Sequence, residues 1–268
     1  MNELLSTSFF YGAKFFLFFS QEFIIIPIIV FGFIMGKKDN FGSALSLLLL
    51  TMIFNTLLKS MFQVPLAPHL EKVGFAFPSG HMQSAVVFYG WFFYKTSSLP
   101  LKGLSLILLA GCGWALVYLR YHTWIDVFGS IGFGVLTLAL YVQFFRKLDA
   151  FDPKFRLIFI GACFFAIASL FLGFLGYHGE VLAHVWMAYY ALMGFSLAWG
   201  ILGNGGEFSQ CRGLFGALGC LAFIFLIQSL FQKFFLTRLP SYLFEMQWLL
   251  SAGSLPIVAK MISHKEPK

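Results

Sequence analysis

Residues 41–62, FGSALSLLLLTMIFNTLLKSMF, decide the fold class of this chain. The stretch is as long as the roughly 20 apolar residues that a helix needs to cross a bilayer. Similar stretches lie at 16–36, 80–98, 100–119, 125–145, 156–176, 181–203, 212–232 and 243–262. The chain is 59% hydrophobic and 11% charged, whereas soluble domains carry about 25% charged residues. We therefore expect an all-α, polytopic integral membrane helix bundle with about nine spans.

A polar break at residues 146–156 divides the apolar stretches into two groups. It contains several charges and Pro153, and it is the longest interruption of this kind. We expect a bundle of five spans over residues 1–150 and additional spans, of unassigned role, over 151–268. Residues 4–15 are too short to span alone, so they are expected to lie along the membrane surface.

Positive charges are shared unequally between alternate loops. If every apolar stretch crosses, 12 of the 18 Lys and Arg residues lie on one face. These are Lys37, Lys38, Lys95, Lys102, Arg146, Lys147, Lys154, Arg156, Arg212, Lys260, Lys265 and Lys268. Cytoplasmic loops are enriched in Lys and Arg, so the poorer face should open to the outside of the cytoplasmic (inner) membrane. The same distribution accounts for the net charge of +7 without a nucleic-acid partner.

Pro78-Ser79-Gly80-His81 directly precedes an apolar stretch on the poorer face. Ser79 is a common N-cap residue, and Gly80 lets another group approach the backbone closely. The N-terminus of a helix favours an anion such as phosphate. His81 would stand beside that anion and could donate a proton to a leaving oxygen. Taken alone, an ordinary capped helix with an incidental histidine explains this motif equally well.

His122-Thr123-Trp124-Ile125-Asp126 begins a later apolar stretch on the same predicted face. Residues four apart share a helical face, and a carboxylate on one imidazole nitrogen leaves the other free as a nucleophile. Alone, an interfacial histidine and a helix-start aspartate would explain the pattern. Together, two histidines and a carboxylate on one face favour phosphoryl transfer through a phosphohistidine. The candidate catalytic residues are therefore His122, His81 and Asp126.

These motifs resemble those of the type 2 phosphatidic acid phosphatase superfamily, membrane lipid phosphatases and phosphotransferases related to vanadium haloperoxidases. That family shows a Lys followed after six residues by Arg-Pro, then Pro-Ser-Gly-His, then Ser-Arg, five residues, His and Asp. The resemblance covers residues 40–145. It implies His122 as nucleophile, Asp126 as its orienting carboxylate, His81 as acid, and Lys59, Ser79 and the Gly80 amide as ligands of the phosphoryl oxygens. We expect no metal or cofactor, because the histidines are assigned to acid and nucleophile roles and the nearby carboxylates are few.

Two arginines of the family pattern are missing. The first falls on Leu66, followed by Ala67 in place of proline, and the Ser-Arg pair falls on Ala115-Leu116. Arginine recognises phosphate through paired hydrogen bonds, so a doubly charged phosphate would meet a less positive pocket. Arg120, one helical turn after Leu116 on the same predicted face, is the candidate substitute in substrate binding. An interfacial arginine that extends toward water is the equal alternative.

The leading hypothesis is an integral-membrane lipid phosphatase that acts through a phosphohistidine. Its substrate would be a membrane phospholipid or isoprenoid lipid carrying a phosphate or diphosphate. One alternative is a head-group phosphotransferase acting on phosphodiester lipids, because the His-Thr-Trp-Ile-Asp-Val run also resembles sphingomyelin synthases and a diester carries only one negative charge. Another is a non-catalytic lipid-binding or transport protein on a degenerate scaffold. The missing arginines disfavour a vanadium haloperoxidase most, and the oligomeric state is left open.

Overall fold

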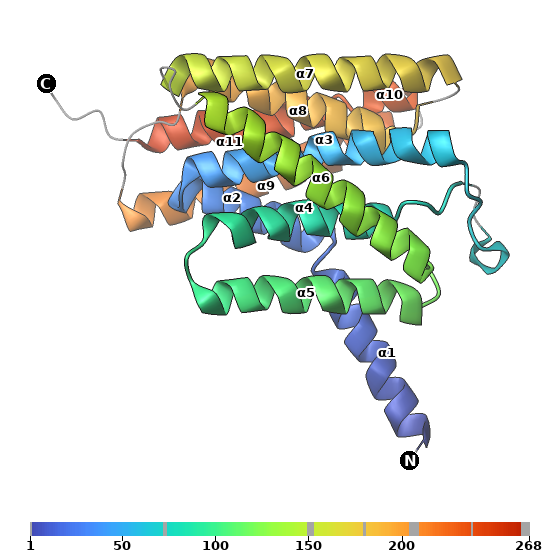
Figure 1. The fold of residues 1–268 in the computed structure, drawn as a ribbon. Helices are drawn as coiled ribbons and strands as arrows, with labels where there is room; N and C mark the ends of the chain where they lie inside the picture. Colours follow the sequence, from blue (N-terminus) through green and yellow to red (C-terminus); the bar gives the residue numbers. More distant parts are fainter. Residues whose placement is uncertain are drawn as a thin grey trace, which may run out of the picture. The chain divides into compact units, whose positions relative to one another are not determined.

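The computed structural model describes residues 2–71, 74–148, 153–178, 181–203, 209–236 and 238–263. In this part of the chain the regular elements are helices (Figure 1). Each of the predicted apolar stretches contains a helix, which confirms the all-α polytopic membrane bundle. The helices are α1 (Asn2–Phe18), α2 (Glu22–Met35), α3 (Lys38–Phe62), α4 (Gly80–Lys95), α5 (Leu99–Tyr118), α6 (Trp124–Leu148), α7 (Pro153–His178), α8 (Ala183–Leu202), α9 (Gln210–Phe235), α10 (Ser241–Phe244) and α11 (Gln247–Ile262), with a 3-10 turn at Pro68–Leu70.

Fewer helices have the length of a full membrane span than the nine predicted stretches suggest. Within the described residues, α3, α5, α6, α8 and α9 are long and apolar enough to cross a bilayer. The pair α1 and α2, bent by 41° at a short break, counts as a sixth candidate if it forms one span. Helices α4 and α11 have only 16 residues each, below the roughly 20 that a span needs.

The predicted boundary between a surface segment at 4–15 and a span at 16–36 is wrong. Helix α1 runs through that boundary to Phe18, and the chain breaks before α2 begins at Glu22. At the break the backbone N–H of Ser20 donates to the carbonyl of Leu17 at 3.0 Å, and the Ser20 hydroxyl donates to the same carbonyl at 2.7 Å. These bonds satisfy a terminal carbonyl and favour an end to the helix there.

The chain forms two compact units. The first contains residues 1–26 and 54–143, and the second contains residues 27–53 and 144–268. Helix α3 therefore contributes its C-terminal part to the first unit and its N-terminal part to the second. Residues 27–53, which precede the polar break at 146–156, belong with the C-terminal helices. Both predicted motifs lie in the first unit.

In the first unit, α5 packs against both α1 and α4. The ring of Phe16 contacts Gly111, so α1 and α5 approach closely at this glycine. Helices α4 and α6 also meet, because the Trp91 and Tyr141 ring centroids lie 5.2 Å apart in edge-to-face geometry. Aromatic and small residues thus fix the helices whose ends carry the motifs.

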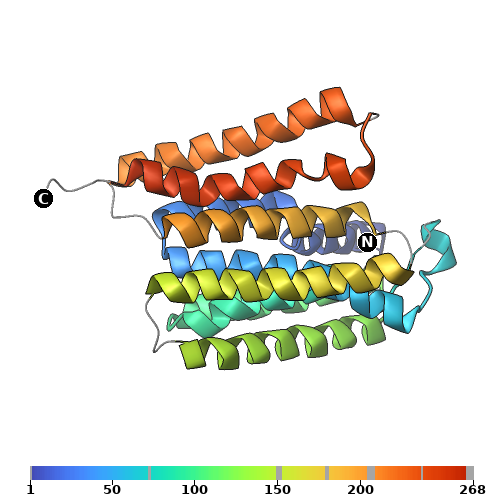
Figure 2. The same ribbon diagram turned by 90° about the horizontal axis from the view of Figure 1, so that it is seen from above.

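In the second unit, α8 lies between α7 and α11, and α9 packs along α11 (Figure 2). The backbones of α8 and α11 touch, since a Cβ added at Gly194 would collide with the carbonyl of Leu249. A Cβ added at Gly253 would likewise lie 3.2 Å from the Gly194 carbonyl oxygen. Small residues that let backbones approach are typical of membrane helix interfaces.

Candidate active site

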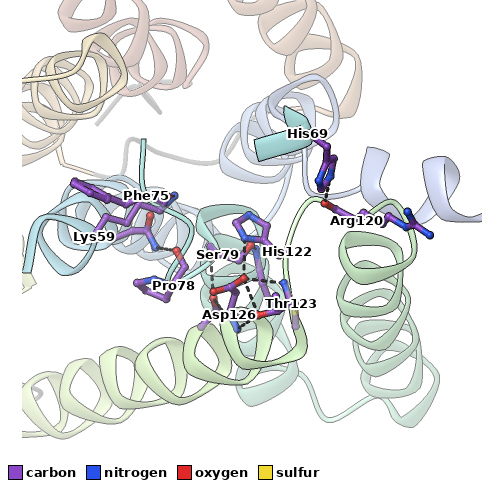
Figure 3. Close-up of polar contacts among 12 residues, drawn as sticks. Lys59, His69, Phe75, Pro78, Ser79, Arg120, His122, Thr123 and Asp126 are labelled. Carbon is purple, nitrogen blue, oxygen red and sulfur yellow. Dashed lines mark hydrogen bonds and ion pairs between the residues drawn. The ribbon is translucent and has the colours of Figure 1, made fainter. Parts of the chain in front are cut away.

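The two histidine motifs meet where α4 and α6 begin (Figure 3). The backbone N–H of Ser79 donates a hydrogen bond to the carbonyl of Asp126 at 3.3 Å. The hydroxyl of Ser130, on α6, lies 2.9 Å from the Ser79 carbonyl and 2.6 Å from the Asp126 carbonyl. Ser79 and Ser130 are both 0% exposed. Direct contacts therefore join the two motifs within the first unit.

The Pro78–His81 motif starts α4 as the sequence predicts. Ser79 is the N-cap, with extended backbone angles, and its hydroxyl accepts from the N–H of Met82 at 3.5 Å. Gly80 is the first helical residue, and His81, which is exposed, follows it. The first N–H groups of a helix have no partner within it, and together with the helix dipole they favour an anion. His81 thus stands beside a potential phosphate site.

His122 lies in the connection between α5 and α6, so it precedes the first turn of α6 rather than sharing it with Asp126. Its Nδ1 is 3.6 Å from Oδ2 of Asp126. This distance exceeds a hydrogen bond but places the carboxylate beside that nitrogen. The Nδ1 atom is buried and has no hydrogen-bond partner among the described residues, and Asp126 is 4% exposed. The other ring nitrogen, Nε2, is the one left to act as a nucleophile.

Thr123 holds Asp126 in place, a role that the sequence analysis missed. The Thr123 backbone N–H and hydroxyl both donate to Oδ2 of Asp126, at 2.7 and 2.9 Å. In return, the Asp126 N–H lies 3.4 Å from the Thr123 hydroxyl oxygen. This is a capping box with aspartate in the third helical position. Threonine three residues before an acidic residue at a helix start was the available signal.

Replacing Thr123 with alanine is expected to lower the free energy of unfolding by about 1 kcal/mol, because the N-cap bond is lost. The matched control is Thr137→Ala on the same helix, where the hydroxyl donates only to the Phe133 carbonyl within α6. Thermal unfolding in detergent would compare the two variants, with Thr123→Ser expected to restore wild-type stability. Equal melting temperatures for Thr123→Ala and Thr137→Ala would show that the capping box contributes nothing.

The surroundings of His122 keep its imidazole neutral. Burial lowers the pKa of His122 from 6.5 to about 4, and the positive charge of Lys59 acts in the same direction. The Asp126 carboxylate opposes this shift and raises the pKa, while His81, when protonated, lowers it further. Lys59, His81 and Asp126 therefore all act electrostatically on His122. A neutral imidazole at neutral pH has the lone pair that nucleophilic attack requires.

Lys59 lies in the last turn of α3 and is bound to the loop that precedes α4. Its ammonium donates to the carbonyl of Phe75 at 2.8 Å. Backbone bonds from Leu66 N–H to the Gly74 carbonyl (3.1 Å) and from Ala76 N–H to the Val64 carbonyl (2.7 Å) close this loop on itself. An ammonium has three donors, so this contact leaves two for a further ligand.

Arg120 does not continue the helical face of Leu116, so that expectation is wrong. Helix α5 ends at Tyr118, and Arg120 has a left-handed backbone with φ of 58°. Its carbonyl oxygen lies 2.9 Å from Nε2 of His69, while its exposed side chain points away from His122 (Figure 3). Leu116 itself is 1% exposed. Once the helix has ended, the periodicity that predicted a shared face no longer applies.

Residues 41–150 match the sequence model of the PAP2 superfamily. This part of the chain belongs to the PAP2 superfamily. A search of curated proteins and a search of solved structures found no match of significance. Membership supports a phosphatase or phosphotransferase type of function on lipid phosphoryl groups, and members of the superfamily are generally phosphoric ester hydrolases.

The PAP2 region also contains a buried polar pair that the sequence analysis missed. Asn55 of α3 is 6% exposed and Gln83 of α4 is 0% exposed. The Asn55 amide nitrogen lies 2.7 Å from Gln83 Oε1 and 3.2 Å from the Pro78 carbonyl. Polar residues inside apolar helices are costly and mark functional positions, which was the signal available for both. Within the described ranges, no group of three or more His, Cys, Asp and Glu side chains gathers in a metal-binding cluster.

Proposed function

We propose that this PAP2-superfamily protein is an integral-membrane lipid phosphatase that works through a phosphohistidine on His122. The observation that carries the proposal is the direct contact between the two motifs, which puts the His122–Asp126 pair beside the N-terminus of α4. The substrate is a membrane phospholipid or isoprenoid lipid with a terminal phosphate or diphosphate. The excess of Lys and Arg in the opposite loops supports a site on the external side of the inner membrane.

In the first step, Nε2 of neutral His122 attacks the phosphorus atom and forms a P–N bond. The P–O bond to the lipid breaks, and His81 gives its proton to the leaving oxygen. Asp126 stands beside Nδ1 and stabilises the positive charge that develops on the imidazole. Lys59, the Ser79 hydroxyl and the Gly80 N–H hold the non-bridging oxygens at the start of α4. We assign Arg120 no contact with the transferred phosphoryl group, because its side chain points away.

In the second step, His81 takes a proton from water, and the water oxygen attacks phosphorus. The P–N bond breaks, inorganic phosphate leaves, and His122 returns to its neutral form. The acid of the first step thus becomes the base of the second, which restores His81 to its protonated form.

The pH profile of kcat/KM should respond in opposite directions to two substitutions near His122. Since neutral His122 attacks, activity falls as pH drops through its pKa, which is about 4. Lys59 lowers that pKa and Asp126 raises it, so Lys59→Gln should move the acid limb to higher pH and Asp126→Asn to lower pH. Both variants lose maximal rate, and normalised profiles measure the shift. If the acid limb moved in the same direction in both variants, the assignment of neutral His122 as the nucleophile would be contradicted.

A second candidate function is head-group transfer from a phosphodiester lipid. The observation that favours it is the weak positive charge of the site: Leu66 and Leu116 occupy the positions of the family arginines, and Asp126 offsets Lys59. A phosphomonoester carries about −1.5 to −2 at neutral pH, whereas a diester carries a single negative charge. In this case the diester P–O bond to the lipid breaks, and a second alcohol attacks the phosphohistidine in place of water.

One reconstitution separates these functions. Purified protein in vesicles receives, in turn, a lipid phosphomonoester, a lipid diphosphate and a phosphodiester lipid with an acceptor lipid alcohol. Free phosphate and transferred head group are followed separately. We expect free phosphate from the lipid phosphomonoester or from the lipid diphosphate. Head-group transfer without free phosphate would replace it with the second function. Binding without turnover of any lipid would favour a non-catalytic lipid-binding protein.

A further inference from the structure

Asn55 connects α3 to the turn that begins α4. It lies one helical turn before Lys59 in α3, so the two side chains share a helical face. Its amide nitrogen is 3.2 Å from the Pro78 carbonyl and 2.7 Å from Gln83 Oε1. Its Oδ1 faces Gly80 and would lie 3.2 Å from a Cβ at that position. One buried amide therefore touches three parts of the segment from Pro78 to Gln83.

The hydrogen bonds define the orientation of this amide. The Pro78 carbonyl can only accept, so the atom facing it must be Asn55 Nδ2. The same nitrogen then donates its second hydrogen to Gln83 Oε1. This arrangement leaves the Gln83 amide nitrogen buried with no hydrogen-bond partner in the described part of the chain. A buried donor without a partner is unfavourable, so the Asn55–Gln83 pair lowers the stability of the fold. This loss of stability falls beside the turn that forms the proposed phosphate site.

The backbone of Ser79 is held from the opposite side as well. Its N–H donates to the Asp126 carbonyl, and its own carbonyl accepts from the Gln83 N–H at 3.0 Å and faces the Ser130 hydroxyl. These contacts connect the turn to α6 and to α4 itself. Asn55 supplies the connection to α3, the helix that carries Lys59. The Asn55 side chain thus connects Pro78 directly to that helix.

We infer that Asn55 is a positioning residue for phosphoryl transfer. It sets the position of the Ser79 hydroxyl and the Gly80 N–H relative to Lys59, so that these donors reach the same phosphoryl group. This inference rests on the proposed phosphohistidine mechanism. Because neither family arginine is present, the site depends on these donors for stabilising transition-state charge, and their spacing limits the rate.

The test uses two variants of the full-length protein in vesicles. Asn55→Leu removes the amide at similar size, and Asn55→Asp keeps the shape but offers the Pro78 carbonyl no donor at neutral pH. The control is Thr51→Val, one turn earlier in α3, where a 0% exposed hydroxyl donates only to the Leu47 carbonyl. Each protein is assayed for kcat, for KM and for inhibition by orthovanadate, which becomes five-coordinate when a nucleophile binds it and then mimics the transition state.

Both Asn55 variants should lose about 100-fold in kcat, the effect of misplacing a catalytic group by about 1 Å. The vanadate inhibition constant should rise in parallel, while KM changes little and Thr51→Val resembles wild type. Partial unfolding would reduce kcat but leave the vanadate constant of the surviving enzyme unchanged, so an unchanged constant overturns the inference. If His122→Ala kept its activity, the proposed mechanism would fail. Loss in His122→Ala with normal vanadate inhibition in both Asn55 variants would reject the positioning role alone.

Discussion

His122→Ala is expected to abolish turnover, with a loss on the order of 10⁴- to 10⁶-fold in kcat, the range seen when single members of a catalytic triad are removed. The reason is that the first step forms a bond to Nε2 of this imidazole, and the neighbouring histidine, His81, is assigned to proton transfer. The measurement is release of phosphate or transfer of head group from the best substrate of the panel.

The control for this loss is His184→Ala, which removes an exposed histidine at the start of α8 in the second unit. It should leave the rate unchanged, and both variants should elute as the wild type does in detergent. A His122→Ala enzyme with more than a tenth of wild-type activity would exclude the phosphohistidine. An equal loss in His184→Ala would point to a general defect in folding or reconstitution.

Gly194→Leu is expected to destabilise the second unit severely. The Cβ would collide with the Leu249 carbonyl and lie 2.8 Å from its carbon, so α8 and α11 would have to separate. Overpacking of this kind costs about 3 kcal/mol, which corresponds to a fall of roughly 6–12 °C in Tm for a domain of 150–250 residues. Thermal unfolding in detergent, followed by circular dichroism, measures it.

The matched control is Gly219→Leu on α9, which makes the same change in the same unit. Gly219 is exposed, and a Cβ there meets nothing within 4 Å. Its Tm should stay within a few degrees of wild type. If Gly194→Leu were equally stable, the close contact of α8 with α11 would be incorrect.

Much of the fold could be predicted because a membrane helix needs a long apolar stretch, and such stretches are visible in the sequence. What could not be predicted depends on local competition for hydrogen bonds. The break after α1 follows from the Ser20 hydroxyl bond to the Leu17 carbonyl, and nothing in the apolar pattern marks it. Helix α4 is short because the Ser79 cap starts it at Gly80 and it ends at Lys95.

The site residues within the two histidine motifs could be predicted, because their residue types suit phosphoryl transfer. The sequence placed both motifs at helix starts, and the structure brings Ser79 and Asp126 into contact. Asn55 and Ser130 were missed because their partners are backbone carbonyls far away in the sequence. Arg120 was misplaced because extrapolating a helical face requires knowing where the helix ends. Contacts between segments far apart in the sequence depend on how the helices pack, and local sequence patterns do not predict this packing.

Trapping the covalent intermediate tests directly whether His122 becomes phosphorylated. The protein is mixed with substrate labelled in the transferred phosphoryl group, quenched within milliseconds in alkali, in which phosphohistidine persists, and digested for peptide mapping. We expect an acid-labile label on the peptide that contains His122, present in wild type and absent from His122→Ala. Label on another residue, or turnover in the same sample with His122 unlabelled, would contradict it.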